Sequence, residues 1–431
     1  MRSLFLSAIF LLSTNFILAQ QLTFSKDNLY PYEGTFDLGN NHRITLGIFD
    51  EFKSLVYLDL KTLKIGALIP LENNLFRDNN DSTMLFMFLR DKNNNVEGLK
   101  ISKNSLPLLL GKRVSPHTRQ SISFVSGKQT LKGDIYIPTS KGPHLAVVFA
   151  HGSGASTRSV GFFTTYFLQL GIAVLTFDKQ GAGESTGDWE TASFDELADD
   201  VIAGINFLKK QNNINTKKIG IMGNSQGGWI GPMVTAKSKD VAFLLVRVGA
   251  GENVMETMLH ENRGSYLADG FKQQEVEEIL KMDRAYMQSA MQGETWEQGD
   301  SVISSLKNNS WFTKIYPNPR VKSVRSEKGL KWLNKNLMYD SYDYLKNVKV
   351  PVLWMMAEKD WNVNSQKGYP RIITALQLAG NKDFSVRIIP NSGHRGLIAE
   401  TGYYNEAISW QYAPGFWDTM QKWLRKRKIA Q

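Results

Sequence analysis

The sequence predicts a doubly wound α/β fold with a mostly parallel sheet, and three observations indicate it. Residues 145–150 and 172–177 are continuous apolar runs, which are typical of strands buried on both faces of a parallel sheet. Residues 193–211 have the apolar spacing of an amphipathic helix. Further short apolar runs and helical stretches then alternate. Strands that alternate with helices imply right-handed βαβ crossovers and helices on both faces of the sheet.

The other elements of this sheet follow in chain order. A hairpin is expected from residues 122–125 and 131–137, turning at Gly127-Lys128, and a helix from residues 160–170. Ser193 and Glu196 form a capping box at the start of the helix over residues 193–211. The remaining strands are expected at residues 218–222, 241–248, 350–356 and 384–389, and a final helix carries Phe416, Met420, Trp423 and Leu424 on one face.

Two further segments depart from this alternation. After residues 1–20, residues 21–116 read as a β-rich accessory domain, either a small sandwich or a barrel, with strands near residues 54–60, 63–69, 84–89 and 96–102. Residues 252–345 interrupt the main domain, which spans residues 117–431. They are too long for a loop, so we expect a helical cap insertion.

Composition limits the partners of the chain. The formal net charge is +10 over 431 residues, but the basic residues are scattered and no nucleic-acid motif accompanies them, so a solvated basic face is expected and no nucleic-acid partner. Residues 1–20 resemble a secretory signal peptide whose apolar core is too short to span a membrane, so cleavage is expected rather than membrane insertion. Export without any cysteine favours a bacterial periplasmic or secreted protein.

The most informative motif is Gly223-Asn224-Ser225-Gln226-Gly227, between a predicted strand and a predicted helix. A serine hydroxyl is a weak nucleophile unless it is held exposed beside a base and near N–H donors. Glycines on either side of Ser225 allow the sharp turn that presents the hydroxyl in this way. The motif therefore predicts Ser225 as a nucleophile.

The base and its orienting acid are expected beyond the last two strands. His394 lies in a turn just after residues 384–389, and it would reach the carboxyl edge of the sheet, where ligands bind in open α/β folds. Asp360 follows residues 350–356 and is the leading candidate to orient His394, with Glu252 as the alternative. No other histidine has a comparable position.

An oxyanion site needs two N–H donors, and two loops are suited to provide them. The backbone amide of Gln226 directly follows the nucleophile, and a second amide, that of Ser153, lies in the glycine-rich loop after residues 145–150. His151 in this loop is expected to shape it rather than to act as a base. The loop lacks the motifs of nucleotide-binding loops, so a nucleotide is not expected.

These motifs together resemble a known family. From about residue 118 to residue 428 the chain resembles the α/β-hydrolase superfamily, in particular bacterial esterases and serine-aminopeptidase-like hydrolases. The matching segments are His151-Gly152-Ser153-Gly154, Gly223 to Gly228, Glu358-Lys359-Asp360, Ser392-Gly393-His394, and Asp178 to Gly187 with the pattern D-x-x-G-x-G-x-S-x-G. The resemblance implies Ser225 as nucleophile, Asp360 as orienting acid, His394 as base, an oxyanion hole from the amides of Gln226 and Ser153, and neither a metal nor an organic cofactor.

The sequence is compatible with three functions. The first is hydrolysis of a carboxylic ester of a small molecule through an acyl-enzyme. The second is an exported aminopeptidase or amidase with the same triad, in which Glu256, Glu261 and Asp269 of the cap would receive a substrate amino terminus. The third is a binding protein that keeps the fold with an inactive site. The Met and aromatic side chains of the cap line either an apolar pocket or the core of the cap itself.

Overall fold

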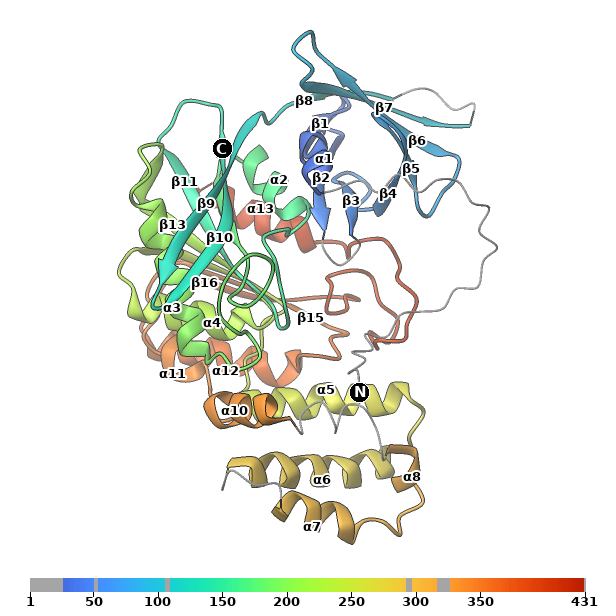
Figure 1. Ribbon diagram of the computed structural model, residues 1–431, viewed down its shortest axis with the longest axis vertical. Helices are drawn as coiled ribbons and strands as arrows, with labels where there is room; N and C mark the ends of the chain where they lie inside the picture. The colour runs from blue at the N-terminus through green and yellow to red at the C-terminus, as the bar shows by residue number, and fades with distance from the viewer. Residues whose placement is uncertain (1–25, 50–52, 105–108, 292–296, 316–325, 430–431) are drawn as a thin grey trace.

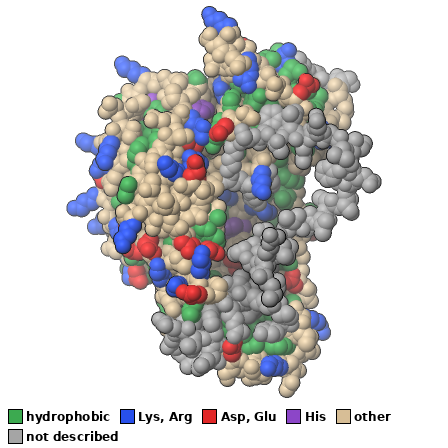
Figure 2. Space-filling view, in the orientation of Figure 1, with side chains coloured by type: hydrophobic (Ala, Val, Ile, Leu, Met, Phe, Trp, Pro, Cys, Tyr) green, Lys and Arg blue, Asp and Glu red, His purple; other side chains and the backbone are tan. Residues whose placement is uncertain are grey.

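The computed structural model describes residues 26–49, 53–104, 109–291, 297–315 and 326–429. The signal peptide predicted over residues 1–20 lies outside them. Figure 1 shows a central sheet flanked by helices at the left, a barrel at the upper right and a separate set of helices at the bottom. Within the described ranges, no helix combines the length and the apolar character that crossing a membrane requires. Lys and Arg side chains are scattered over the face drawn in Figure 2.

The central sheet has eight strands in the order β16-β15-β14-β13-β11-β12-β10-β9. Strands β11 to β16 run parallel, whereas β10 pairs antiparallel with both β9 and β12. The predicted mostly parallel sheet is therefore confirmed. The strands are β9 (His117–Ser126), β10 (Gln129–Pro138), β11 (His144–Ala150), β12 (Ala173–Phe177), β13 (Ile214–Asn224), β14 (Val241–Arg247), β15 (Val352–Ala357) and β16 (Phe384–Ile389).

Helices cover both faces of this sheet. One face packs against α3 (Phe194–Leu208), α4 (Gly227–Lys237) and α12 (Ser365–Leu378), and the other against α2 (Phe162–Gln169) and α13 (Phe416–Lys426). The predicted capping box is present at the start of α3: Ser193 Oγ accepts from the amide of Glu196, whose carboxylate accepts from the amide of Ser193.

The N-terminal β-rich region is a closed eight-stranded barrel. Helix α1 (Lys26–Leu29) and the 3-10 turn η1 (Tyr30–Tyr32) precede it. Its interior is filled by aromatic and aliphatic side chains, with Phe36, Phe76 and Phe86 fully buried. The strands are β1 (Gly34–Asp37), β2 (Arg43–Phe49), β3 (Ser54–Asp59), β4 (Ile65–Glu72), β5 (Leu75–Asp78), β6 (Met84–Arg90), β7 (Val96–Lys103) and β8 (Leu109–Arg113).

Strand β3 of the barrel is buried on both of its faces. Successive side chains of a strand point in opposite directions. Leu55 and Tyr57 accordingly belong to the barrel interior, whereas Val56 and Leu58 belong to the apolar core that lies between the sheet and helices α2 and α13. One wall of the barrel is therefore part of the core of the main domain.

The insertion after β14 forms a helical cap with its own core. Its helices are α5 (Val254–Ala268), α6 (Gln273–Met291), α7 (Glu297–Ser305), α8 (Phe312–Ile315), α10 (Glu327–Asn336) and α11 (Tyr342–Leu345). Met255, Tyr266, Tyr286 and Met287 are buried against one another in this cap. Of the two interpretations of these side chains, the core of the cap is the one observed; Trp296 lies outside the described residues.

Candidate active site

Ser225 lies on a strained turn between β13 and α4. Its φ angle is +51°, a left-handed conformation that is uncommon for a serine. The glycines around it are required sterically: a Cβ on Gly223 would lie 2.5 Å from the carbonyl oxygen of Gly227, and a Cβ on Gly227 would lie 2.2 Å from that of Ala150. The sequence therefore folds here into a sharp turn at the carboxyl end of a central strand.

A hydrogen-bonded chain joins Ser225, His394 and Asp360. His394 Nε2 lies 3.0 Å from Ser225 Oγ, and His394 Nδ1 lies 2.9 Å from both carboxylate oxygens of Asp360. The three residues follow β13, β16 and β15, so the parallel sheet brings them to one edge. A carboxylate accepts hydrogen bonds, so this geometry fits a His394 ring with its proton on Nδ1, which places Nε2 to accept from the serine hydroxyl.

The carboxylate of Asp360 is held in place by its own loop. Its side chain is only 1% exposed, and Oδ1 accepts hydrogen bonds from the amides of Asn362 and Val363 at 2.9 and 3.0 Å. The alternative acid, Glu252, lies instead in a different cavity with Lys367 and His260, where burial raises the pKa of its carboxyl group. Of the two candidate acids, Asp360 is the one bonded to His394.

The two amides predicted for the oxyanion belong to neighbouring segments: a Cβ on Gly152, the residue before Ser153, would lie 3.5 Å from Ser225 Cβ. Ser153 lies in the loop after β11, and Gln226, directly after Ser225, is the N-cap of helix α4. Within the described part of the chain, neither amide has a hydrogen-bond acceptor. His151 Nε2 donates to the carbonyl oxygen of Phe177 at 2.6 Å, and burial lowers the pKa of His151 to about 4, so its ring is neutral. His151 therefore shapes the loop, as the sequence indicates.

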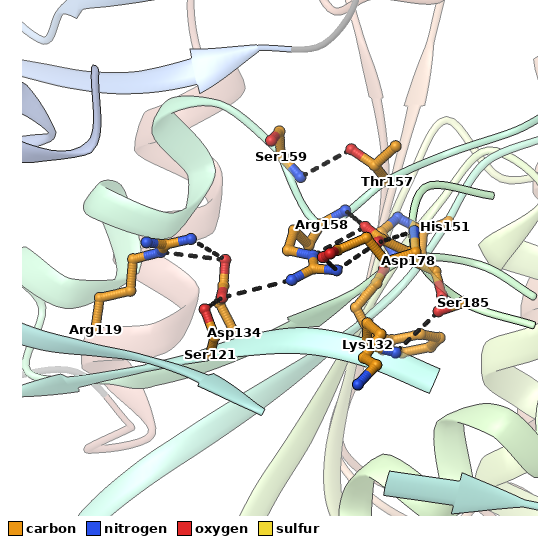
Figure 3. Close-up of polar contacts among 12 residues, drawn as sticks. Arg119, Ser121, Lys132, Asp134, His151, Thr157, Arg158, Ser159, Asp178 and Ser185 are labelled. Carbon is orange, nitrogen blue, oxygen red and sulfur yellow. Dashed lines mark hydrogen bonds and ion pairs between the residues drawn. The ribbon is translucent and has the colours of Figure 1, made fainter. Parts of the chain in front are cut away.

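The D-x-x-G-x-G-x-S-x-G segment, residues 178–187, holds the loop after β11 through hydrogen bonds. Arg158, in the second half of this loop, donates from its backbone to Asp178 Oδ1 at 2.8 Å and from Nη2 to Asp178 Oδ2 at 2.5 Å. Figure 3 shows the Arg158 guanidinium between Asp178 and the fully buried Asp134. The hydroxyl of Ser185 donates to the backbone oxygen of Asp178 at 2.7 Å. The motif thus holds the loop that carries Ser153 through buried charge-assisted hydrogen bonds.

Sequence reasoning missed Lys179 in the same segment. Its buried ammonium group donates to the carbonyl oxygen of Gly152 and, at 3.0 Å, to Oε1 of Gln226. Burial lowers the pKa of Lys179 to about 7. A single side chain therefore ties the two segments whose amides are the oxyanion candidates. The only signal in the sequence was the position of Lys179 inside the motif.

Arg247, at the end of β14, was also missed. Its Nη1 donates to Asn224 Oδ1 at 2.6 Å, and its Nη2 donates to the carbonyl oxygen of Arg395 at 2.9 Å. The guanidinium lies over the rings of Phe163 and Phe416. Arg247 thus connects the residue before Ser225 with the residue after His394. A charged residue at the carboxyl end of an otherwise apolar strand was the available signal.

Two cavities adjoin this site and share Phe49, Asn224 and Arg247. The loop-side cavity, of about 330 Å³, is lined by Ser153, Val160 and other residues of the loop after β11, together with Phe149, Phe163 and Met222 beneath it. The barrel-side cavity, of about 300 Å³, is lined by His394, Leu397, Trp410 and Tyr412 and, from the barrel, by Val56 and Ile65. Among the described residues, both cavities have walls from the barrel and neither has one from the cap.

The cap carboxylates considered for an amino-terminus site are engaged elsewhere. Glu256 forms a two-point ion pair with Arg284, at 2.6 and 2.9 Å, and Asp269 accepts a hydrogen bond from the hydroxyl of Tyr404. Glu261 also takes part in an interaction of its own. From α5, His260 Nε2 donates to the backbone oxygen of Asp360 at 3.0 Å, so the cap contacts the acid loop. Within the described ranges, no cluster of His, Asp and Glu side chains is arranged to hold a metal ion.

The fold and the serine turn together define an α/β hydrolase. The model of the family described as serine aminopeptidase, S33, matches residues 141–401, and the chain belongs to this family. An uncharacterized 31.7 kDa protein of Escherichia coli is 31% identical over 105 residues, which cover 24% of this chain and 36% of that protein. Esterase EstD of Thermotoga maritima is 21% identical over 278 residues, covering 63% of this chain and 59% of the esterase.

Solved structures resemble the main domain more distantly. The α/β hydrolase GrgF of a Penicillium species aligns with a TM-score of 0.45 at 15% identity, covering 73% of this chain and 97% of that chain. The chain spans about a third to three-fifths of the length of the two curated relatives named above.

Proposed function

We propose that this protein is a serine hydrolase that cleaves carboxylic esters of small molecules through an acyl-enzyme intermediate. Ser225 is the nucleophile, His394 the general base and acid, and Asp360 the residue that orients the imidazole. The amides of Gln226 and Ser153 form the oxyanion hole. The observation that carries the proposal is the continuous hydrogen-bonded chain from Ser225 Oγ through His394 to Asp360.

The first half-reaction forms the acyl-enzyme. Ser225 Oγ attacks the ester carbonyl carbon while its proton moves to His394 Nε2. The resulting tetrahedral oxyanion accepts hydrogen bonds from the two amides. The bond from this carbon to the alcohol oxygen then breaks, and His394 Nε2 gives its proton to the departing alcohol. Asp360 stays ionised and stabilises the imidazolium that exists between the two proton transfers.

The second half-reaction releases the acid. A water molecule gives a proton to His394 Nε2 as its oxygen attacks the acyl carbon. Collapse of the second tetrahedral intermediate breaks the bond to Ser225 Oγ, which regains its proton from His394. The products are a carboxylic acid, an alcohol and the starting enzyme, so atoms and protons balance.

An ester is favoured over a peptide substrate by the state of the cap carboxylates. A free amino terminus needs an available carboxylate, but Glu256 is already paired with Arg284 and Asp269 already accepts a hydrogen bond. The Thermotoga maritima relative is named as an esterase, which agrees with this choice.

The test compares esters with aminoacyl amides. We expect the purified protein to hydrolyse p-nitrophenyl acetate and butyrate faster than aminoacyl p-nitroanilides. Ser225→Ala should lose roughly 10⁴-fold or more in kcat, whereas Ser304→Ala, at an exposed cap position, should retain activity. Faster turnover of the anilides would favour the peptidase, and failure of a fluorophosphonate probe to label Ser225 would favour an inactive binding protein.

A further inference from the structure

The two cavities beside Ser225 contain different parts of the proposed machinery. The loop-side cavity is lined by Gly152 and Ser153, and the barrel-side cavity is lined by His394. Asn224, which precedes the nucleophile, lines both of them. An ester bound at Ser225 therefore has one cavity on the side of the oxyanion amides and the other on the side of the imidazole.

This asymmetry assigns the two halves of an ester. His394 must give a proton to the alcohol oxygen, so the alcohol part of the substrate has to leave on the side of the imidazole. We propose that the barrel-side cavity is the leaving-group subsite, and that the substrates are esters of bulky, apolar alcohols whose alcohol part packs against Val56 and Ile65 of the barrel. This assignment rests on the proposed function.

The lining of the barrel-side cavity gives the chemical class. Val56, Ile65 and Leu397 are aliphatic, and Trp410 and Tyr412 add aromatic surface. Small-molecule sites are mostly apolar and carry a few polar groups that fix orientation. Here the polar groups of the lining are His394, Arg395 and the Asn224–Arg247 pair. A polar alcohol such as a sugar would bury hydroxyls against aliphatic side chains without partners, which is costly.

The barrel wall of this cavity is fixed to the hydrolase domain. The amide of Ile65 donates to the carbonyl oxygen of Trp410 at 2.9 Å, and the amide of Tyr412 donates to that of Leu63 at 2.8 Å. The backbone of Phe49 forms an antiparallel bridge with that of Val160. These backbone contacts hold side chains from both domains around one cavity, so the subsite is preformed. The β-rich region is therefore part of the substrate site.

A third cavity also touches His394, but it lacks contact with the nucleophile turn. It is lined by Trp361, Gly393, Ala399, Tyr403 and neighbouring residues, and by none from the Ser225 turn or from the loop that carries Ser153. The barrel-side cavity includes both His394 and Asn224 and is the one that an alcohol group reaches directly.

The experiment varies the alcohol at constant acyl group and constant acidity of the alcohol. Ethyl acetate and cyclohexylmethyl acetate both release primary alkyl alcohols, so a difference in kcat/KM reports binding of the alcohol part. We expect the wild-type enzyme to prefer cyclohexylmethyl acetate by about tenfold or more, the size expected when several methylene groups enter an apolar pocket. Cyclohexylmethanol should also inhibit turnover of p-nitrophenyl acetate competitively, and ethanol should do so far more weakly.

Matched variants locate the preference. Ile65→Phe fills the barrel-side cavity, and Val160→Phe fills the loop-side cavity. Ile65→Phe should reduce the preference for cyclohexylmethyl acetate over ethyl acetate about tenfold. The ratio of turnover of p-nitrophenyl hexanoate to that of p-nitrophenyl acetate should not change. The loop-side cavity is left for the acyl part, so Val160→Phe should reduce the ratio of hexanoate to acetate turnover and leave the alcohol preference unchanged. If Ile65→Phe does not fold, inhibition of the wild-type enzyme by cyclohexylmethanol still tests the leaving-group subsite.

The outcomes separate this assignment from the proposed function. Ser225-dependent hydrolysis with equal kcat/KM for the two acetates, or with no inhibition by cyclohexylmethanol, would overturn the leaving-group subsite and leave the esterase standing. A change in acyl preference rather than alcohol preference in Ile65→Phe would reverse the assignment of the two cavities. If the protein hydrolyses none of these esters, the proposed function falls and the subsite falls with it.

Discussion

The ammonium nitrogen of Lys179 lies 3.0 Å from the side-chain oxygen of Gln226, the residue that follows the proposed nucleophile. The same ammonium group donates to the carbonyl oxygen of Gly152, next to Ser153. The two amides proposed for the oxyanion therefore come from segments that share one donor. An oxyanion hole stabilises a transition state only when its donors are fixed before the reaction, and Lys179 supplies this connection.

Lys179→Met should accordingly lower kcat more than it changes KM. The methionine fills a similar volume but no longer donates to Gln226 Oε1 or to the carbonyl oxygen of Gly152, so the loop loses its connection to Gln226. We expect a decrease in kcat of about 10- to 100-fold on p-nitrophenyl acetate, somewhat less than the loss expected for an oxyanion donor itself. Lys128→Met, in the exposed turn between β9 and β10, is the control. A rise in KM at unchanged kcat would contradict this role.

Asp360→Asn should impair the base without disturbing the fold. The remaining amide oxygen still accepts from the amides of Asn362 and Val363, which now bond to Oδ1. The new NH₂ group, however, faces His394 Nδ1 and favours the tautomer with the proton on Nε2. That tautomer cannot accept from Ser225, so kcat should decrease by about 10³- to 10⁴-fold. Measuring kcat at pH 7 checks this prediction. Asp195→Asn, at an exposed position of α3, is the control and should keep full activity. Equal kcat values in the two variants would show that Asp360 has no role in the mechanism.

The proposed site divides into residues that the sequence could indicate and residues that it could not. Ser225, Asp360 and His394 each follow an apolar strand, and parallel strands end at one edge of a sheet, so their proximity was foreseeable. Lys179 and Arg247 act through contacts between segments far apart in the chain, and their residue type alone does not reveal such contacts. The cavity walls from Val56 and Ile65 depend on how the barrel docks, which no local periodicity encodes.

The same distinction applies to the fold. The helix that begins after Ser193 was foreseeable because its cap and its apolar stripe are local signals. Four barrel strands, β1, β2, β5 and β8, had no such signal, since their stability comes from pairing with neighbours around the closed barrel. The choice between a sandwich and a barrel was also open, because closure depends on the pairing of β1 with β8, which are distant in sequence.

Gly47→Ala should loosen the barrel from the hydrolase domain. Strand β2 passes so close to the start of α2 that a Cβ on Gly47 would lie 2.4 Å from the carbonyl group of Gly161, which is backbone and has little room to move. We expect a loss of about 1–3 kcal/mol in the free energy of unfolding, as for other overpacked sites. Urea unfolding checks this. Gly98→Ala, where the nearest atom would lie at 3.1 Å, should cost less, and equal losses would argue against a tight junction at Gly47.

Glu33→Gln should change how stability depends on pH. The Glu33 side chain is buried at the junction; Oε1 accepts from the amide of Ile48 at 3.0 Å, and Oε2 lies 3.5 Å from the hydroxyl of Tyr136. Burial raises the pKa of Glu33 from 4.5 to about 7. Between these values the folded protein holds a proton that the unfolded chain has lost, so the free energy of unfolding falls as pH rises from 4.5 to 7.

A glutamine keeps the acceptor for Ile48 and has no proton to lose. The wild-type protein should therefore lose stability relative to Glu33→Gln between pH 4.5 and 8, by roughly 3 kcal/mol if the whole shift is expressed. Asp200 and Lys179, whose pKa values burial also brings to about 7, are present in both proteins, so their contributions cancel in the difference. Urea unfolding at a series of pH values measures this difference. Parallel stability curves for the two proteins would show that the pKa of Glu33 is the same in the folded and the unfolded chain, so that its neighbours compensate for its burial.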